Sequence, residues 1–447
     1  MSTGTPADPT ATPTADGIVT EARDCIVVGG GPAGVMLALI LARGGVRVTV
    51  LEKHRDFLRD FRGDTVHAST IRLMDELGFG EAFAALPQDR LGNFELPAGD
   101  GTTVTIADFG RLDPPYDYIA MIPQWDLLDF LVEQATPERG FDIRMQAEVT
   151  GLTSEDGAVT GVEYLDHATG TRHRLTAPLT VACDGRSSLL REQAGLVPTE
   201  YPVPFDTWWF RLPRHEGERQ HSALMPVFGD GELALSLVRD TFFQIAYFRE
   251  KGADAALRAE GLDRFRERIA HLRPDLADRV SAITSLDEVH LLDVKLNRLR
   301  RWHRPGLLLI GDAAHAMSPA GGVGINLAVQ DAVAAATRLA GPLRSGTLTE
   351  GDLAAVQRRR YPPTVIIQTL QRGLQKAIFG PAVQGRRSAP PAALIALVRR
   401  VPALSALPAR LIALGPRPEH APAFARRPGR TSTSAGAPGA ATSDAAG

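Results

Sequence analysis

Short apolar runs in the first fifty residues alternate with a helical segment. Residues 25–28 (Cys-Ile-Val-Val) and 47–51 (Arg-Val-Thr-Val-Leu) are rich in β-branched residues. Runs of this kind are typical of strands that are buried on both faces of a parallel sheet. Residues 35–42, between them, have the composition of a helix. The pattern predicts a strand, a tight turn, a helix and a second strand over residues 24–52.

Further along the chain, the pattern of apolar and polar positions changes. Residues 143–183 read as three strands separated by short turns, a β-meander that returns to the parallel sheet. Residues 201–294 combine alternating strands and clustered aromatic residues with a charged helix at 254–271, which indicates a separate antiparallel sheet. Residues 306–310 form another buried apolar run. The predicted fold class is α/β: a Rossmann-like domain with an inserted β-meander, an antiparallel-sheet domain and a helical C-terminal region.

The predicted domains are discontinuous, because the chain leaves the parallel sheet and returns to it. A hairpin signal at residues 94–109 starts the second domain before the meander. A length of 447 residues also exceeds one ordinary core, which favours two intertwined domains. The predicted boundaries are 1–23 for a disordered tail, 24–82, 120–195 and 290–345 for the nucleotide-binding domain, 83–119 and 196–289 for the second domain, 346–425 for a helical region, and 426–447 for a disordered tail.

The turn after the first strand carries glycines at a spacing that suits a dinucleotide. Gly29, Gly31 and Gly34 permit a sharp turn, a close approach to a pyrophosphate and tight packing of helix on strand. The start of the helix presents unpaired N–H groups and a positive dipole end to phosphates. Glu52 ends the second strand, where a carboxylate can accept both ribose hydroxyls. An acid there disfavours a 2′-phosphate, so the sequence predicts FAD or NAD rather than NADP.

Two later strands end in an aspartate beside a glycine. Asp184 and Gly185 follow residues 179–183, and Gly311 and Asp312 follow residues 306–310. Ligands of open α/β sheets bind at the carboxyl ends of strands, although a strand that ends in Asp-Gly is by default an ordinary turn. Asp312 is placed to hold the hydroxyls of a ribityl chain.

The segment after Asp312 suits a flat ring. Glycines at 321, 322 and 324 allow the backbone to approach a ring edge, and a small-residue helix begins near Gly324. Its free N–H groups and positive end would favour an anionic reduced flavin. Two further residues each have two interpretations. His315 is a base or, as we favour, a structural residue, and Arg62 covers a pyrophosphate or adenine or is a solvated surface arginine.

Composition excludes several classes of function. The net charge is only −3 and charged residues make up 23% of the chain, which argues against nucleic acid as the main partner. Cys25 and Cys183 both fall in predicted buried strands, so we expect small core residues in a reducing compartment, with neither a disulfide nor a metal site. The first residues lack the apolar centre of a signal peptide, and no uncharged apolar run approaches the ~18 residues of a membrane span. We therefore expect a cytoplasmic protein.

Three motifs in this order carry a family resemblance: the glycine turn with Glu52, the run Cys183-Asp184-Gly185-Arg186-Ser187-Ser188, and the run Gly311-Asp312-Ala313-Ala314-His315. Together they resemble the single-component FAD aromatic hydroxylases typified by para-hydroxybenzoate hydroxylase, over residues 24–345. The resemblance implies FAD as cofactor and a substrate in the antiparallel-sheet domain. The residues it implies at FAD are Gly29, Gly31, Pro32, Ala33 and Gly34 in the turn, Glu52 and Lys53 at the adenosine ribose, Arg62 and Gln124 at the phosphate and ribityl region, Val149 beside the adenine, Asp184 in a motif that serves FAD and nicotinamide, Asp312 at the ribityl chain, Pro319 near the oxygen site, and Gly322, Gly324, Ile325 and Asn326 at the ring.

The resemblance also implies a reaction. The sequence holds no second GxGxxG unit, so we expect NADPH or NADH as a transient co-substrate without a domain of its own. In similar enzymes the reduced flavin and dioxygen form a 4a-hydroperoxide, which hydroxylates an aromatic, phenolic or polyketide-like small molecule. No residue matches the phenol-activating groups of the prototype, so no catalytic base is predicted. Trp208, Phe210 and Phe243 are candidates, by composition, to line the substrate pocket.

Other readings of the sequence stay open. The same scaffold supports a flavin-dependent reductase, dehydrogenase or halogenase, and a non-catalytic flavin-binding module is a further alternative. Residues 390–416 form an apolar, arginine-dotted stretch, for which packing over the flavin domain is favoured and docking on a membrane surface is the alternative. The sequence leaves open the substrate, the choice between NADH and NADPH, and the oligomeric state.

Overall fold

A computed structural model provides the fold. The residues that it describes are 12–13, 18–58, 65–98, 100–215, 218, 223–239, 241–387 and 389–428. Arg62 and most of the two predicted tails lie outside these ranges.

A six-stranded sheet forms the first layer of the molecule. Its strands, in spatial order, are β10 (Phe141–Arg144), β4 (Val48–Leu51), β3 (Cys25–Val28), β14 (Thr180–Ala182), β24 (Leu307–Leu309) and β23 (His303–Arg304). All neighbours pair in parallel except β23 with β24. The chain fills the sheet on one side of β3 and then crosses to the other side, so β3 is the switch point where such sheets bind ligands.

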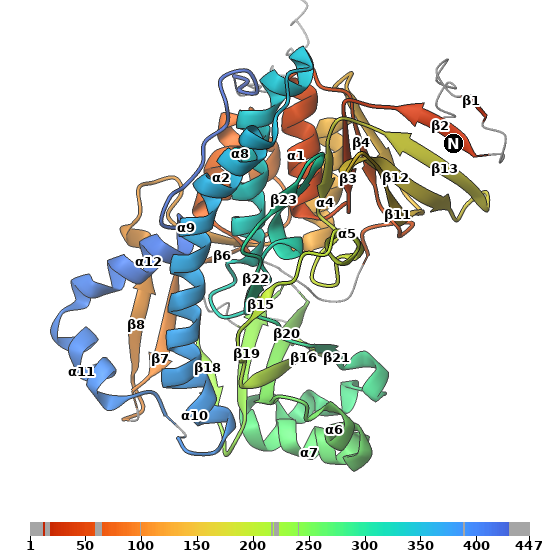
Figure 1. Cartoon of the computed structure of the whole chain (residues 1–447). Coiled ribbons are helices and arrows are strands. Elements are labelled where there is room, and N and C mark those ends of the chain that lie inside the picture. The colour runs from red at the N-terminus through yellow and green to blue at the C-terminus, as the bar shows by residue number, and fades with distance from the viewer. Residues whose placement is uncertain are drawn as a thin grey trace, which may run out of the picture.

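Helices cover one face of this sheet and the meander covers the other (Figure 1). Cys25 and Val27 pack with α1 (Pro32–Arg43), α4 (Gln124–Ala135) and α8 (Gly324–Ser345). The alternate residues Ile26 and Val28 pack against the meander. Both faces of β3 are buried, which explains its uninterrupted apolar run.

The meander consists of β11 (Ala147–Glu155), β12 (Ala158–Asp166) and β13 (Thr171–Thr176). Its β13 edge pairs in parallel with β2 (Val19–Ala22), which pairs with β1 (Thr12–Pro13). The expected disordered tail therefore does not extend over residues 19–22. Main-chain pairing holds this strand, and Glu21 adds ion pairs to Arg23 and Arg144.

A five-stranded antiparallel sheet forms the second layer, below the first in Figure 1. Its strands, in spatial order, are β18 (Pro226–Phe228), β19 (Leu233–Val238), β20 (Phe242–Glu250), β16 (Phe205–Pro213) and β21 (His290–Leu292). The predicted helix at 254–271 is two helices, α6 (Asp254–Glu260) and α7 (Leu262–Leu272), because Gly261 between them has a φ of 85°. Two 3₁₀ segments follow, η2 (Pro274–Ala282) and η3 (Leu286–Glu288).

Small elements connect the two layers. The strands are β5 (Thr65–Val66), β6 (Asp89–Leu91), β7 (Asn93–Pro97), β8 (Thr103–Asp108), β9 (Ile119–Met121), β15 (Thr199–Glu200), β17 (Ala223–Leu224) and β22 (Asn297–Arg298). The helices are α2 (Ala68–Glu76), α3 (Gly80–Ala84), η1 (Phe109–Arg111), α5 (Leu189–Gln193) and η4 (Gly311–Ala313). The hairpin predicted at 94–109 is β7 paired with β8.

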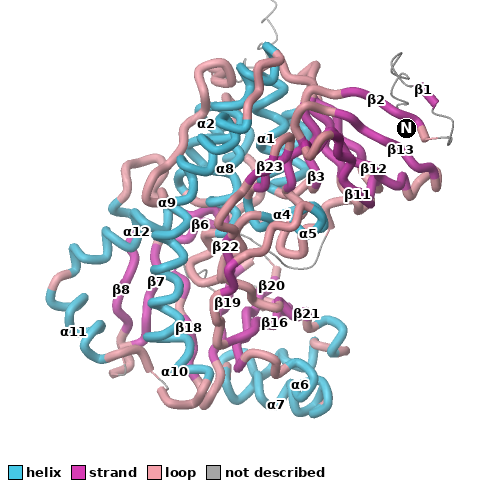
Figure 2. The backbone as a smooth tube through the Cα atoms, viewed as in Figure 1, coloured by secondary structure: helices cyan, strands magenta, loops and turns pink. Residues whose placement is uncertain are grey.

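The long helix α9 (Glu350–Leu374) runs from the first layer to the second (Figure 2). It continues through a π-helical turn, η5 (Gln375–Phe379), into α10 (Gly380–Val383), which packs against the antiparallel sheet. The apolar stretch then forms α11 (Ala392–Arg400), η6 (Pro402–Ser405) and α12 (Ala406–Ala413).

The α11 helix covers the β7–β8 hairpin, whereas α12 also packs on the parallel-sheet domain that was expected to hold this stretch: Ile412 contacts the cluster of Met317, Val323 and Leu327, and Ser69 Oγ donates to the Ala413 carbonyl at 3.2 Å. Ile395 and Val398 of α11 pack with Leu96 and Val104 of the hairpin. Within the described residues, no single helix has the length and apolar composition of a membrane span. The α11–α12 pair does so only as two pieces bent by 109°.

The segment after α12 returns to the first layer. The Glu419 N–H donates to Gln330 Oε1 at 2.8 Å, and the Ala421 N–H donates to Glu76 Oε2 at 2.7 Å. Arg43 Nη1 donates to the Ala425 carbonyl at 2.8 Å. This return segment (residues 416–428) therefore fastens α8, α2 and α1 together.

Candidate functional site

The carboxyl ends of four parallel strands meet at one edge of the first sheet. Gly29 follows β3 and donates its N–H to the carbonyl of Leu51, beside Glu52, at 2.8 Å. Cys183, beside Asp184, donates its N–H to the Val28 carbonyl at 2.7 Å. Ile310 donates its N–H to the Ala182 carbonyl at 3.1 Å. The structure thus gathers the four motif positions, far apart in the sequence, at a single edge.

The glycine turn is fixed by backbone packing at two positions and open at the third. A Cβ at Gly29, whose φ is 104°, would lie 2.4 Å from the Cys183 carbonyl oxygen. A Cβ at Gly34 would lie 2.0 Å from the Gly29 carbonyl oxygen. A Cβ at Gly31 would meet no atom within 4 Å. Gly29 and Gly34 are therefore required for the fold of the turn, whereas Gly31 leaves space in front of the helix.

The helix α1 directs its N-terminus into this space. Pro32 is its first residue, no side chain caps the preceding Gly31, and the first turn holds no acidic residue. Its first N–H groups and the positive end of its dipole are left for an anion. The turn therefore offers what a pyrophosphate needs.

Glu52 is buried beside the turn, with 2% of its surface exposed. Its Oε2 accepts the Gly30 N–H at 2.8 Å, and its Oε1 accepts the His54 N–H at 3.0 Å. His54 Nδ1 lies 2.7 Å from the same Oε1. The carboxylate is thereby fixed at the edge of the turn, while the neighbouring Lys53 is exposed.

Asp184 carries an unsatisfied buried oxygen. Its Oδ2 accepts the Leu190 N–H at 3.2 Å, but its Oδ1 is buried without a hydrogen-bond partner among the described residues. Burial raises the pKa of the Asp184 carboxyl. A buried acceptor without a partner marks a place where a bound molecule can supply a donor.

Two arginines tie the Asp184 loop to the Asp312 loop. Arg186 Nε donates to Asp312 Oδ2 at 3.1 Å. Arg191 donates from Nη1 to the Ala313 carbonyl at 3.0 Å and from Nη2 to the Arg186 carbonyl at 2.6 Å. Asp312 keeps about a third of its side chain exposed (32%), so the carboxylate is held and accessible at once.

Strand β5 and the start of α2 clamp the loop that precedes α8 and the first turn of α8. Thr65 Oγ1 donates to the Gly322 carbonyl at 2.9 Å. Ser69 Oγ and Thr70 Oγ1 donate to Asn326 Oδ1 at 2.7 and 2.9 Å. Pro319, Gly321, Gly322 and Gly324 are only half-buried, so the clamped loop keeps an accessible side.

A buried charge network lies behind this loop. Asp331 is 0% exposed. Its Oδ2 accepts the Gly311 N–H at 3.1 Å and lies 2.6 Å from His315 Nε2, and its Oδ1 accepts Arg360 Nε at 3.0 Å. Arg360 also donates to Glu419 Oε1 at 3.1 Å. His315 is 1% exposed within this network, which agrees with the structural role favoured for it.

The remaining predicted positions are dispersed around the site. Gln124 is the first residue of α4 and is half-buried. Val149 lies in β11 with 8% of its surface exposed, and it belongs to the core between meander and sheet. Ile325 is buried in the first turn of α8.

The aromatic residues expected to line a pocket lie on the covered face of the antiparallel sheet. Trp208 (0% exposed) and Phe210 (1%) pack with α6, α7 and η2, and Phe243 packs against the same cluster. Trp208 Nε1 donates to Asp254 of α6 at 2.8 Å. This position does not fit the expected role in a substrate pocket, because adjacent strand residues point to opposite faces.

The neighbouring Trp209 occupies the face that is directed toward the first layer. It packs with Leu237, Ile119 and Met121, and its Nε1 is buried without a hydrogen-bond partner among the described residues. Composition pointed to the aromatic strand but did not show which of its residues lie on which face. Trp209 is therefore the tryptophan of this strand that lies on the face opposite α6 and α7.

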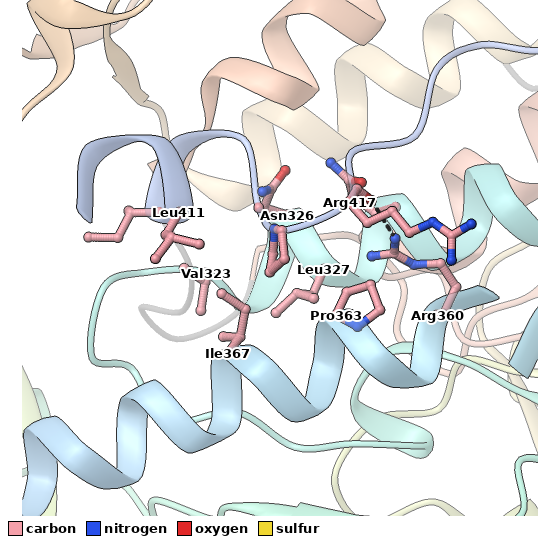
Figure 3. A pocket seen from close by; sticks show the side chains of 12 residues that line it. Val323, Asn326, Leu327, Arg360, Pro363, Ile367, Leu411 and Arg417 are labelled. Atoms are coloured by element: carbon pink, nitrogen blue, oxygen red, sulfur yellow. Dashed lines mark hydrogen bonds between the residues drawn. The ribbon is translucent and has the colours of Figure 1, made fainter. Parts of the chain in front are cut away.

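A pocket lies between α8, α9, α12 and the return segment (Figure 3). Val323, Leu327, Ile367 and Leu411 supply part of its apolar lining, and its cavity volume is about 10 Å³. A single water molecule needs a volume of about 10–15 Å³. We therefore do not place the substrate there.

Sequence reasoning missed several residues that hold the site. Arg191 could have been found from the sequence, because it ends the run Asp-Gly-Arg-Ser-Ser-Leu-Leu-Arg that begins at Asp184. Asp331 could also have been found, because a charge inside a helix of small apolar residues needs a buried partner. Its partner Arg360 could not have been found from the sequence, because only the fold brings α9 beside α8. His67, buried at the start of α2, was missed as well.

The residues at this edge fit a flavin dinucleotide. The turn has open space at Gly31 and free N–H groups at α1 for a pyrophosphate. Glu52 and Asp312 are carboxylates that can accept hydroxyl groups, and Asp184 Oδ1 is an unsatisfied acceptor between them in the strand order. Among the described residues, no group of three or more His, Cys, Asp or Glu side chains could hold a metal ion.

Comparison with known proteins agrees with this fit. The sequence matches the family described as "FAD binding domain" over residues 22–365. It is 36% identical to 6-methylpretetramide 4-monooxygenase from Streptomyces rimosus, over 88% of this chain and 91% of that protein. It is 28% identical to rifampicin monooxygenase from Streptomyces venezuelae, over 81% of this chain and 74% of that protein.

A solved structure shows the same fold. The anhydrotetracycline hydroxylase OxyS from Streptomyces rimosus superimposes with a TM-score of 0.68 at 24% identity. The match covers 88% of this chain and 76% of that protein. The predicted fold class is confirmed.

Proposed function

The chain belongs to the FAD binding domain family and is an FAD-dependent monooxygenase, and we propose that its substrate is a polycyclic aromatic compound of the polyketide class. The observation that carries this proposal is the 36% identity to 6-methylpretetramide 4-monooxygenase over 88% of the chain. The face of the antiparallel sheet that carries Trp209 supports it, whereas Trp208 and Phe210 are enclosed on the other face. A substrate of fused rings matches a site bounded by Trp209 and by apolar side chains such as Leu237 and Met121.

The proposed placement of FAD assigns a role to each motif. The α1 N-terminus and the turn at Gly31 would hold the pyrophosphate, Glu52 would hold the adenosine ribose, and Asp312 would hold the ribityl chain. Residues 319–326 would border the flavin ring. When bound and reduced by NADH or NADPH, FAD supplies activation of dioxygen for transfer of one oxygen atom to the substrate.

The protein's own part is to orient and to exclude water. Arg186 and Arg191 hold Asp312 and its loop, and Thr65 fixes the Gly322 carbonyl at the ring edge. Apolar side chains on the Trp209 face, such as Leu237 and Met121, would help to keep water away from the reacting atoms. The buried cysteine Cys25 and the half-buried Cys183 are both free thiols, which supports action in the cytoplasm.

Anaerobic stopped-flow reduction tests the proposal. The purified protein is mixed with NADPH or NADH, alone and with tetracyclic polyketides or simple phenols, and the loss of flavin absorbance is followed. We expect a polycyclic polyketide to accelerate reduction by one nicotinamide. Incorporation of one ¹⁸O atom from labelled dioxygen should follow in air.

Three outcomes would overturn parts of the assignment. A protein that fails to take up FAD contradicts the placement of the cofactor. A product that contains halide and no oxygen from dioxygen supports the halogenase alternative, and reduction that only phenols accelerate contradicts the polycyclic substrate.

A further inference from the structure

Residues 389–410, which contain α11, η6 and the first half of α12, have an inner and an outer face. The inner face is closed by protein, because Ile395 and Val398 pack on the β7–β8 hairpin and Ala409 lies in a second buried cluster. On the outer face, every exposed residue is alanine, leucine, valine, proline or arginine. A surface helix normally turns a mixture of polar and charged residues to water, so this outer face is suited to a partner.

Four large apolar side chains gather at the corner of this segment. Leu397 is 53% exposed, Val401 40%, Leu404 39% and Leu407 62%. They lie on both sides of the 109° bend between α11 and the piece formed by η6 and α12. Figure 1 shows this corner at the margin of the molecule, outside strand β8. The exposed apolar groups are therefore carried on a projection.

The charge of the segment has a single sign. Residues 385–418 include six arginines and neither aspartate nor glutamate, although the whole chain has a net charge of −3. Arg399 pairs with Asp100 of the hairpin turn at 2.8 Å. Arg400 and Arg410 are exposed close to the leucines in sequence and have no acidic partner among the described residues. The outer face therefore favours an anionic partner.

An anionic lipid surface matches both properties. Leucine side chains can enter the boundary of the acyl chains, while arginine lays its aliphatic stem along apolar surface and brings its guanidinium to a phosphate. An acidic protein would also match the arginines, but it would need a preformed groove for a projecting corner, whereas a bilayer yields to one. Because the inner face stays packed on the hairpin, the segment would lie along such a surface.

We propose that the outer face of residues 389–410 docks on a membrane surface rich in anionic lipid. Leu397, Leu404 and Leu407 enter the acyl boundary, and Arg400 and Arg410 bind lipid phosphates. The inference concerns a surface separate from the flavin site and goes beyond the proposed function. It also joins the two placements that the sequence left open for this stretch, since one face packs on protein and the other on lipid.

Sedimentation of the holoprotein with vesicles tests the proposal. The wild type should sediment with vesicles of equal parts phosphatidylglycerol and phosphatidylcholine, and stay in solution with phosphatidylcholine alone. The double variant Leu404→Gln/Leu407→Gln should bind the anionic vesicles at least about tenfold more weakly, since burial of one leucine is worth about that factor. Arg400→Gln/Arg410→Gln should also bind at least about tenfold more weakly, because each basic residue at an anionic surface contributes about fivefold.

Salt and two control variants complete the experiment. Raising the salt from about 0.1 M to about 1 M should weaken the wild type as the arginine variant does, because the screening length falls from about 10 Å to about 3 Å. Val197→Gln and Arg338→Gln change exposed side chains outside the segment and should leave vesicle binding unaltered. Circular dichroism should be the same for all variants, since every substituted side chain is exposed.

Three results would overturn the inference. One is a wild type that stays in solution with anionic vesicles. Another is binding that the arginine variant loses and the leucine variant keeps, which would be adsorption by charge alone. The third is a wild-type dimer, seen by sedimentation velocity, that Leu404→Gln/Leu407→Gln dissociates, which would assign the face to a second copy of the chain. The proposed function is tested separately, because flavin reduction and ¹⁸O incorporation are measured without vesicles.

Discussion

The two sheets of this molecule use their side chains in different ways. In the parallel sheet the site is made by main chain: Gly29 and Gly34 are dictated by backbone atoms that would lie 2.4 and 2.0 Å from a Cβ. In the antiparallel sheet, the surroundings of a side chain depend on which of the two faces it points to, and neighbouring residues point to opposite faces. Trp208 is sealed beneath α6, while Trp209 faces the first layer. A position where only glycine fits can be recognised in the sequence. The face of a strand on which a side chain lies cannot be recognised in the same way.

The sharpest contrast within the parallel sheet is between Gly34 and Gly31. Gly34→Val should prevent folding, because its Cβ meets the Gly29 carbonyl oxygen at 2.0 Å and overpacking already costs about 1–3 kcal/mol where side chains can adjust. Gly31→Ala should fold like the wild type but bind FAD more weakly, since its Cβ enters only the open space. Circular dichroism and FAD titration distinguish the two.

Equal FAD affinity in Gly31→Ala and wild type would show that the space at Gly31 is not used. A folded, yellow Gly34→Val would show that the turn can rearrange. Either result would weaken the claim that backbone packing specifies this layer.

The next largest effect is expected at the buried charge behind the site. Asp331→Asn should lower the free energy of unfolding by about 3–5 kcal/mol, because it leaves Arg360 and His315 without their carboxylate. Although burial opposes ionisation, His315 and Arg360 hold the pKa of Asp331 below its usual value. Its contribution should therefore persist above about pH 4 and disappear as the pH falls through the lowered pKa. Urea unfolding at pH 7 and pH 3 measures both effects, with the exposed Asp263→Asn as the matched control.

Substitutions of the two tryptophans test which face of the antiparallel sheet each side chain occupies. Trp208→Ala should destabilise the protein by about 3–5 kcal/mol, as expected for a large aromatic removed from a closed core. Trp209→Ala should destabilise it less, because this side chain is not fully enclosed, and should mainly raise the substrate concentration needed to stimulate flavin reduction. Urea unfolding and stopped-flow reduction provide the two readouts. A larger kinetic effect from Trp208 than from Trp209 would reverse the assignment of faces.

The smallest effect concerns pH. The pKa of His67 falls from 6.5 to about 4 on folding, so between these values only the unfolded chain carries the proton. The free energy of unfolding should decrease by about 3 kcal/mol as the pH is lowered through this window. In His67→Leu this slope should be reduced. Urea unfolding of the apoprotein from pH 7 to pH 4 measures it, and parallel curves for both proteins would contradict the burial of a neutral ring.

The sequence was sufficient to predict the parallel sheet and the order of its motifs. Residues 25–28 and 306–310 are apolar because both faces are buried, and this leaves a continuous run that can be read directly. The resemblance and the match over residues 22–365 agree on the family. The roles of the single FAD-binding residues stay predictions, and Arg62 lies outside the described residues.

The sequence was not sufficient where a contact depends on distant segments. Strand β2 looks like tail in composition and is held only by pairing with β13. Trp208 and Phe210 were chosen for residue type, but a shift of one residue moves a side chain to the other face. Arg360 and Glu419 reach Asp331 only through the packing of α9 and the return segment.

The return segment has a consequence for the timing of assembly. Arg43 lies in the first helix of the site, yet its hydrogen-bond acceptor, the Ala425 carbonyl, is translated 382 residues later. Glu419 completes the surroundings of Arg360 at the same late stage. A nascent chain still attached to the ribosome at residue 400 has every nucleotide motif but lacks this fastening. The first helix of the site and the surroundings of Arg360 are therefore completed only after residues 416–428 have been synthesised.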